Sequence, residues 1–241
     1  MLKENQKIFV FSGAGISAPS GVNTFRDKGG IWYQHLKDEV CNALTFVENY
    51  EKVHDFYNER RVQLADIEPN NAHILVKELQ DKYGVDSVIN ITTNVDNLFE
   101  KAGVKNTLYL HGKIWEMKNV DTDEIIDIGF TKFDYSDVST LHKPNVTFFY
   151  EISPAYTDLH NIQTFDMKTG DILIFIGMSF QVLPAYSLLP NNPTTKVHTF
   201  NINLNGTDED HVFDKTYNGC VLEMLPIALS DVEKLLKEQD K

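Results

Sequence analysis

Short apolar runs alternate with stretches of helical periodicity along this chain of 241 residues. The apolar runs predict buried strands over residues 8–11, 87–92, 107–110, 146–150, 172–176 and 196–202. Apolar residues at helical spacing predict helices over residues 45–65, 72–82 and 230–237. Strands and helices that alternate in this way indicate an α/β fold with a doubly wound parallel sheet, covered by crossovers on both faces.

Two segments interrupt this alternation. We expect residues 24–70 and 113–145 to form a smaller inserted lobe, of which the first segment is partly helical. The larger lobe would then consist of residues 1–23, 71–112 and 146–241. The chain is long enough for one such domain with a large core.

A glycine-rich turn follows the first predicted strand. Gly13 and Gly15 are small enough for an anion to approach the backbone, and N–H groups at the start of a following helix would point at it. The usual G-x-G-x-x-G pattern is incomplete because position 18 is Ala, and taken alone the turn is as readily a plain tight turn. Phe25 and Arg26 favour a phosphate site, since a guanidinium can neutralise a pyrophosphate and a phenyl ring can cover a sugar.

Further motifs along the chain resemble, in order, those of the NAD-dependent sirtuins. They read GAGIS at Gly13, SGVNTFR at Ser20, PNNAH at Pro69, TTNVD at Thr92, HG at His111, GMSFQVLPA at Gly177 and NIN at Asn201. The resemblance covers most of the chain. It implies a Rossmann-like parallel sheet with a smaller lobe, and NAD as the cofactor.

The resemblance also implies catalytic roles. Asn94 and Asp96 would hydrogen-bond the nicotinamide carboxamide and the ribose, and His111 would be the general base for a ribose hydroxyl. Imidazole suits this task because its ordinary pKa is near 6.5. A single histidine after a strand is more often structural, but its place after the TTNVD motif favours the base. Asn94 and Asp96 can also cap the next helix, and both roles can coexist.

By the same resemblance, the NAD contacts lie in a few turns. The turn at Gly177 repeats the pattern of a strand followed by glycine, although a plain tight turn is the alternative. Asn203 would replace the acidic ribose ligand of ordinary dinucleotide folds, and Cys220 would lie in an adenine-side loop before the last helix. The complete predicted set is Gly13, Ala14, Gly15, Ile16, Ser17, Phe25, Arg26, Trp32, Thr93, Asn94, Val95, Asp96, Gly177, Met178, Ser179, Asn203, Leu204, Asn205, Cys220 and Val221.

An acyl-lysine protein or peptide is the substrate that the resemblance implies, bound as an extra strand between two chain segments. One segment contains Phe149, Tyr150 and Glu151, and the other contains Phe180 and Val182. Tyr150 stands where the family has a glycine, so the groove departs from the family pattern.

Cysteine usage also departs from the family. Cys41 and Cys220 are far apart, which indicates neither a disulfide framework nor a metal site. The zinc ribbon typical of sirtuins needs two C-x-x-C pairs after the His-Gly motif, and residues 113–143 contain no cysteine. We therefore expect no zinc, with short strand-like pieces over residues 122–130 in place of the ribbon.

Charge and hydropathy exclude some partners. The formal net charge of −13 argues against nucleic acid, which is bound by clustered Lys and Arg. An acidic surface would attract a lysine-bearing peptide, although solubility is the plainer explanation. No apolar run approaches the roughly 20 residues of a membrane helix, and the charged start MLKENQK argues against a secretory signal. We therefore expect a cytoplasmic protein.

Three functions fit these observations. The first is an NAD-dependent protein-lysine deacylase, which cleaves the nicotinamide–ribose bond and transfers the acyl group to ADP-ribose. The second is an NAD glycohydrolase or ADP-ribosyltransferase of a zinc-free sirtuin-like type, favoured by the missing ribbon and the TTNVD variant. The third is a non-catalytic nucleotide sensor, which the presence of both Asn94 and His111 disfavours. The acyl group, the target protein and the oligomeric state are left open.

Overall fold

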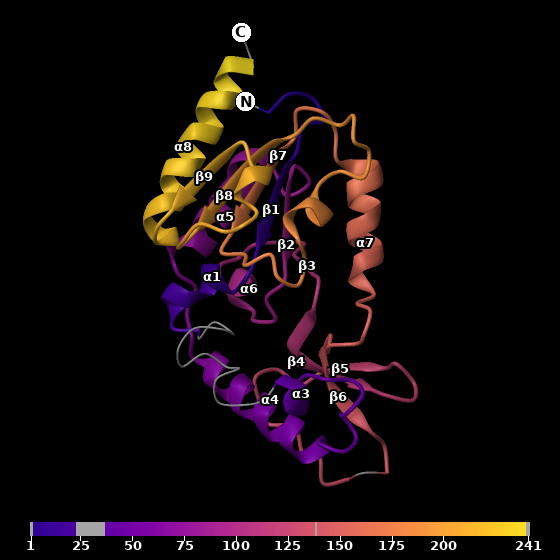
Figure 1. Cartoon of the computed structure of the whole chain (residues 1–241). Helices are drawn as coiled ribbons and strands as arrows, with labels where there is room; N and C mark the ends of the chain where they lie inside the picture. The colour runs from indigo at the N-terminus through magenta and orange to yellow at the C-terminus, as the bar shows by residue number, and fades with distance from the viewer. Residues whose placement is uncertain (1, 23–36, 138, 240–241) are drawn as a thin grey trace.

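A computed structural model describes residues 2–22, 37–137 and 139–239. Six parallel strands form the main sheet in the order β3-β2-β1-β7-β8-β9 (Figure 1). Their bounds are β1 Ile8–Ser12, β2 Val88–Thr92, β3 Leu108–Tyr109, β7 Ile172–Ile176, β8 His198–Asn203 and β9 Lys215–Asn218. The predicted parallel sheet is thus confirmed.

The central strands β1 and β7 are buried on both faces, as their unbroken apolar sequences predict. Ile8 and Val10 belong to a core that includes residues of α5 (Asn71–Tyr83) and α8 (Val221–Gln239). Phe9 and Phe11 belong to a second core, which includes residues of α7 (Ala155–Asn161) and the 3₁₀ turn η3 (Ala185–Leu188). Figure 1 shows α5 and α8 on one side of the sheet and α7 on the other, as expected for a doubly wound fold.

The strand order reverses between β1 and β7. From β1 the chain continues to β2 and β3 on one side of the sheet, and from β7 it continues to β8 and β9 on the other side. The loops after β1 and β7 therefore leave the same edge in opposite directions. In open α/β sheets this switch point is where ligands bind.

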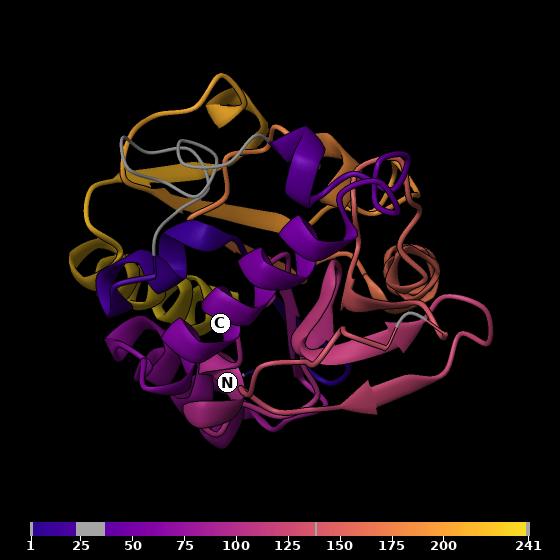
Figure 2. The ribbon, with the colours of Figure 1, turned by 90° about the horizontal axis from the view of Figure 1, so that it is seen from below.

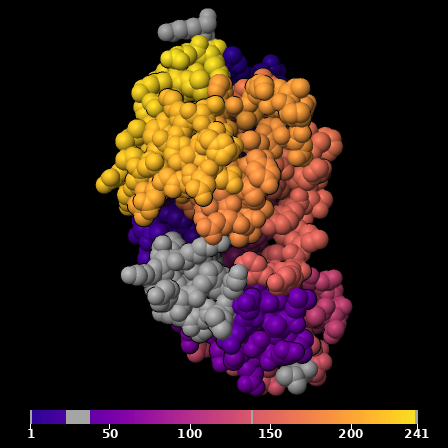
Figure 3. Space-filling model, viewed as in Figure 1, coloured from indigo at the N-terminus to yellow at the C-terminus, as the bar shows by residue number. Residues whose placement is uncertain are grey.

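A second, antiparallel sheet of three strands has the order β5-β4-β6. It consists of β4 Gly112–Asn119, β5 Ile125–Asp127 and β6 His142–Val146. Helices α3 (Lys37–Val40) and α4 (Tyr50–Ala65) share a separate hydrophobic core with β4 and β6. This sheet and α4 lie together at one end of the molecule, which Figure 2 shows from below, and Figure 3 shows the C-terminal segments at the opposite end. The lobe boundaries given above stay a prediction.

A buried arginine joins α4 to the small sheet. Arg61 is fully buried, and its guanidinium donates to the carbonyl oxygens of Thr131 and Ile114, each at 3.1 Å, and to Oδ1 of Asn58 at 2.6 Å. All three partners are neutral oxygens, which satisfy the donors of the buried cation. Both cysteines are free, and the described residues contain no group of three or more His, Cys, Asp or Glu that could hold a metal.

Several predicted elements were wrong in position. The strand predicted over residues 146–150 lies at His142–Val146 instead, and Phe149 makes only an isolated bridge to Asn42. The last helix begins at Val221 rather than at residue 230 and contains Pro226, because its apolar residues pack on the sheet over the whole length. The helix predicted from residue 45 begins at Tyr50.

Other elements were not predicted. They are β4, β9, α7 with the π-helical turn η2 (Ile162–Asp166) that continues it, and the short helical turns η1 (Ala18–Ser20), α3, η3 and η4 (Asp210–Val212). The short helix α1 (Ala14–Ser17) lies where a helix was expected after the first glycine turn. The four-residue helix α6 (Leu98–Lys101) lies where the sequence suggested a capped helix. Among the described helices, none combines the length and apolar character that crossing a bilayer requires.

Candidate functional site

Two glycine turns pack directly against each other at the switch point. The Gly13 N–H donates to the carbonyl oxygen of Ile176, and the Gly15 N–H donates to that of Gly177, each at 3.0 Å. A Cβ atom at Gly15 would lie 2.6 Å from Cα of Gly177, and one at Gly177 would lie 2.5 Å from Cα of Gly15. The sequence interpretation assigned these glycines to an approaching anion. In the structure, the close contact between the two backbones already requires glycine at these positions.

Beneath the first turn lies a buried polar network centred on Ser17. Asn94 donates through Nδ2 to the Gly13 carbonyl oxygen and to Oγ of Ser17, each at 3.1 Å. Ser17 in turn donates through Oγ to Oδ2 of Asp96 at 2.9 Å. Oδ1 of Asp96 accepts the Leu98 N–H at 3.1 Å, so Asp96 also caps the first turn of α6. Asp96 therefore combines the helix capping expected from the sequence with a place in the Ser17 network.

The network extends to a histidine that the sequence analysis did not include in the site. His73 is fully buried, and its Nδ1 accepts the Asn70 N–H at 3.3 Å in a capping box at the start of α5. Nε2 therefore carries the hydrogen and faces Oγ of Ser17 at 3.5 Å. Ser17 then uses its one donor and both lone pairs. Burial lowers the pKa of His73 to about 4, which keeps it neutral. The PNNAH motif was the available signal for this residue.

The carboxyl group of Asp96 is a weaker acid than an ordinary aspartate. Burial raises its pKa to about 6, although the hydrogen bonds from Leu98 and Ser17 favour the carboxylate and lower it. A carboxyl group whose pKa is higher in the folded than in the unfolded chain binds its proton more tightly when folded. Its contribution to stability therefore falls as the pH rises from the ordinary pKa of 3.8 to about 6.

We expect Asp96→Asn to remove this pH dependence. Relative to wild type, the free energy of unfolding of the variant should improve by about 2 to 3 kcal/mol as the pH rises from about 4 to about 6.5. Urea unfolding at a series of pH values measures the difference. Asp208→Asn, at an exposed carboxylate, is the matched control and should give curves parallel to wild type. A constant difference between Asp96→Asn and wild type would contradict the assignment.

His111 lies where β3 ends and β4 begins. Its Nδ1 is 3.2 Å from the carbonyl oxygen of Thr93, and its Nε2 is 3.1 Å from the hydroxyl of Tyr156 in α7. A carbonyl oxygen can only accept, so Nδ1 carries the hydrogen and Nε2 presents the lone pair. Burial lowers the pKa of His111 below its ordinary value, which keeps the imidazole neutral at physiological pH. The ring can therefore accept a proton at Nε2.

The structure gathers the predicted cofactor residues at one edge. Those described follow the carboxyl ends of five adjacent strands, β2, β1, β7, β8 and β9, and His111 follows β3. Since these strands are parallel, all of these residues lie along the same edge of the sheet. Asn203 ties two of the strand ends together, because its Nδ2 donates to the carbonyl oxygen of Met178 at 2.9 Å. Phe25, Arg26 and Trp32 lie outside the described residues.

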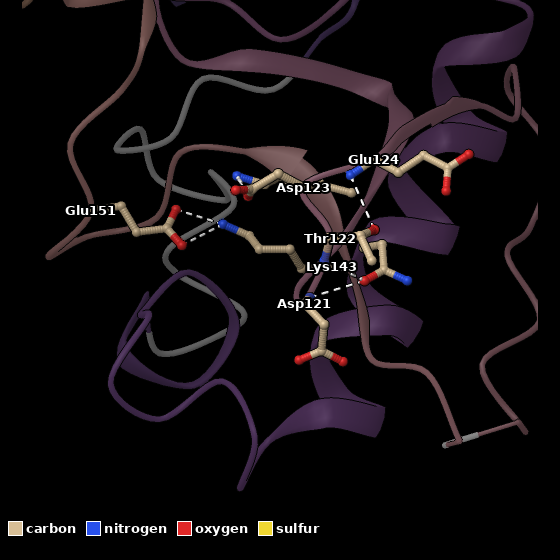
Figure 4. A network of polar contacts seen from close by, with 8 residues as sticks. Asp121, Thr122, Asp123, Glu124, Lys143 and Glu151 are labelled. Atoms are coloured by element: carbon tan, nitrogen blue, oxygen red, sulfur yellow. Dashed lines mark hydrogen bonds and ion pairs between the residues drawn. The ribbon is translucent and has the colours of Figure 1, made fainter.

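The predicted substrate residues differ in accessibility. Tyr150 is 73% exposed with a φ of 69°, so it holds the left-handed conformation that a glycine would favour. Glu151 is held by both of its oxygens to Lys143 at 2.5 Å (Figure 4). Val182 is exposed, whereas the Phe180 side chain is buried against the neighbouring core.

The Phe149 backbone is already paired. Its N–H donates to the Cys41 carbonyl oxygen at 2.9 Å, and its own carbonyl accepts the Ala43 N–H at 3.1 Å. A peptide strand would therefore have to pair with the chain beyond Phe149.

Curated proteins of bacterial origin are similar to the chain over nearly its whole length. The NAD-dependent protein deacylase of Campylobacter jejuni subsp. jejuni serotype O:2 is 34% identical over 239 residues, which cover 97% of this chain and 98% of the relative. The protein of the same name from Pasteurella multocida is 36% identical over 231 residues, covering 93% and 97%. That from Escherichia coli K12 is 32% identical over 244 residues, covering 97% and 84%.

Solved structures of the Sir2 family are similar to the chain in fold. A Sir2 homologue in complex with ADP-ribose superimposes with a TM-score of 0.81 at 26% identity, covering 96% of this chain and 93% of the other. A Sir2 homologue–NAD complex gives 0.79 at 25% identity, covering 95% and 90%. The sequence model of the Sir2 family matches residues 13–184, from the first glycine turn to beyond the second. The two interlocked turns, the Ser17 network and His111 all fall within this match, and the chain belongs to the Sir2 family.

Proposed function

We propose that this chain is an NAD-dependent protein-lysine deacylase that cleaves the nicotinamide–ribose bond and transfers the acyl group to ADP-ribose. The observation that carries the proposal is the neutral His111 imidazole, with its lone pair at Nε2, on the same sheet edge as the two glycine turns. Membership of the Sir2 family and relatives named NAD-dependent protein deacylases support it.

The residues at the switch point fit a dinucleotide. Gly13, Gly15 and Gly177 carry no side chains at the switch point, which is where ligands bind in open α/β sheets. NAD would be held by the turns after β1, β7, β8 and β9, and when bound it supplies a labile nicotinamide–ribose bond and the hydroxyl groups of the ribose. Phe25 and Arg26 keep the roles that the sequence suggested, next to the sugar and the pyrophosphate, and Trp32 stays in the predicted set of NAD contacts.

The chain's own residues then act on the ribose side. Asn94 and Asp96 are fixed in position by Ser17, so that their orientation does not depend on a ligand. With NAD bound, His111 would accept a proton from a ribose hydroxyl at Nε2, while the Thr93 carbonyl oxygen accepts the Nδ1–H bond. An acyl-lysine peptide would lie along the segment after Phe149 and near Val182.

An NAD glycohydrolase or ADP-ribosyltransferase is the second candidate. Tyr150 favours it, because an exposed tyrosine occupies the position at which the family has a glycine beside the peptide. The pairing of the Phe149 backbone with Cys41 and Ala43 points the same way, since it leaves less free backbone for a peptide.

Turnover of NAD with and without an acetyl-lysine peptide separates the two candidates. We expect nicotinamide release to depend on the peptide and to be accompanied by an acyl-ADP-ribose product, both followed by mass spectrometry. A peptide with unmodified lysine is the control and should give no product. Hydrolysis of NAD at the same rate without any peptide would instead establish the glycohydrolase. A cytoplasmic location, the absence of zinc, and the absence of nucleic-acid and membrane partners stay proposals from the sequence.

A further inference from the structure

Tyr156 meets the imidazole of His111 through its hydroxyl group. The two ring centroids are 6.2 Å apart with an interplanar angle of 74°, and the hydroxyl lies 3.1 Å from Nε2. Tyr156 is held at the start of α7, where its N–H donates to the carbonyl oxygen of the buried Ser153 at 3.1 Å. The roles proposed above for the Sir2 site make no use of this tyrosine.

A tyrosine hydroxyl can serve both protonation states of an imidazole. It donates to the lone pair of neutral Nε2, and after a turn of its O–H bond it accepts from a protonated Nε2–H. The second bond involves a charged donor and is therefore the stronger one. A phenylalanine at this position could make neither bond.

We propose that Tyr156 is a positioning residue for His111, which keeps Nε2 directed as the proton acceptor and accepts the Nε2–H bond once the proton has been taken up. This inference rests on the proposed function of His111. The O–H bond of the ribose hydroxyl would break and leave its electron pair on the ribose oxygen. Its proton would form an N–H bond at Nε2, which would then donate to the Tyr156 oxygen. The ribose hydroxyl replaces Tyr156 as the donor to Nε2 before the transfer.

Charged and polar groups near the imidazole could also change its pKa, and the described residues show which of them do. Burial lowers the pKa of His111 and the Thr93 carbonyl raises it, and within the described ranges no charged side chain adds to these two causes. Lys113 forms an ion pair with Glu116 and lies over the rings of Tyr109 and Trp115, so its charge is engaged elsewhere. Thr147, in the loop after β6, donates its N–H to the His111 carbonyl oxygen at 2.9 Å.

The decisive experiment titrates His111 by NMR in the wild type and in Tyr156→Phe, without NAD. The His111 resonance is identified by its loss in His111→Gln. We expect the pKa of His111 to fall by about half to one pH unit in Tyr156→Phe, because the protonated ring loses the stronger of the two hydrogen bonds. An unchanged or raised pKa would overturn the proposal.

Turnover then tests the catalytic consequence. In Tyr156→Phe we expect kcat to fall roughly three- to tenfold with little change in KM for NAD, and the acid limb of kcat/KM to move to lower pH. Tyr135→Phe loses a comparable hydrogen bond, to Asp55 at 2.6 Å, and should change neither the titration nor the rate. Thermal unfolding verifies that both variants are folded.

The titration and the turnover assay test the role of Tyr156 and the proposed function separately. If the wild type shows no turnover of NAD, the proposed function fails, while the titration still decides whether Tyr156 acts on His111. If the wild type turns over NAD and either the titration or the acid limb is unchanged in Tyr156→Phe, the positioning role alone fails.

Discussion

Replacement of His111 by alanine is expected to abolish deacylation while leaving NAD affinity nearly unchanged. General bases contribute about 10²- to 10⁴-fold to rates, and His111 is the neutral imidazole that presents its lone pair at the sheet edge. The affinity should persist because the ring nitrogens of His111 face the Thr93 carbonyl oxygen and the Tyr156 hydroxyl, and not the glycine turns or the Ser17 network. Steady-state kinetics with an acetyl-lysine peptide measure the first quantity, and isothermal titration calorimetry with NAD measures the second.

An exposed histidine provides the control for this variant. His160 lies on α7, the helix that carries Tyr156, and His160→Ala should retain both turnover and affinity. If His111→Ala instead binds NAD much more weakly and still turns it over, His111 is a ligand contact and the base must be another group.

The sequence predicted those parts of the fold that depend on local pattern. The strand at residues 172–176 was correct at both ends, because five consecutive apolar residues bounded by Asp171 and Gly177 leave no other interpretation. The strand at residues 146–150 was wrong for a physical reason. Phe148 and Phe149 pack in the small core, and backbone pairing there depends on Asn42, which is distant in the sequence.

Pro226 shows a second limit of local pattern. The sequence interpretation placed the start of the last helix at residue 230, beyond this proline, from the helical spacing of residues 230–237. A proline inside a helix removes one backbone hydrogen bond. In the structure Val221, Leu225 and Ala228 are buried on the sheet on both sides of the proline, and this packing outweighs the lost bond.

Within the candidate site, the sequence indicated which residues to select more readily than which residues they contact. Asn94, Asp96 and His111 were selected from their motifs, and in the structure all three follow the carboxyl ends of strands of the main sheet. Tyr156 carries no signal in the sequence, because its meeting with His111 depends on how α7 packs on the sheet. The reason for Gly15 was also hidden, since its neighbour, Gly177, lies far along the chain.

The interlocked turns lead to the prediction with the largest effect on stability, for Gly177→Ala. Gly177 has a φ of 62°, and an added Cβ would lie 2.5 Å from Cα of Gly15, a backbone atom that cannot rotate away. The two strands at the centre of the sheet would have to separate to relieve the overlap. We expect the free energy of unfolding to fall by about 4 kcal/mol or more, as for other severe overlaps in a core.

Gly129→Ala isolates the steric part of this effect. Gly129 has nearly the same φ, 61°, but no atom lies within 4 Å of the added Cβ, so only the left-handed backbone strain of about 1 to 2 kcal/mol remains. If Gly177→Ala is too unstable to purify, Gly13→Ala offers a milder overlap, 2.9 Å from the Gly177 carbonyl oxygen, without a positive φ. Urea unfolding should therefore rank the losses as Gly177→Ala above both other variants. Equal losses at Gly177 and Gly129 would mean that the turns can move apart freely, and the close contact between them would then not explain the glycines.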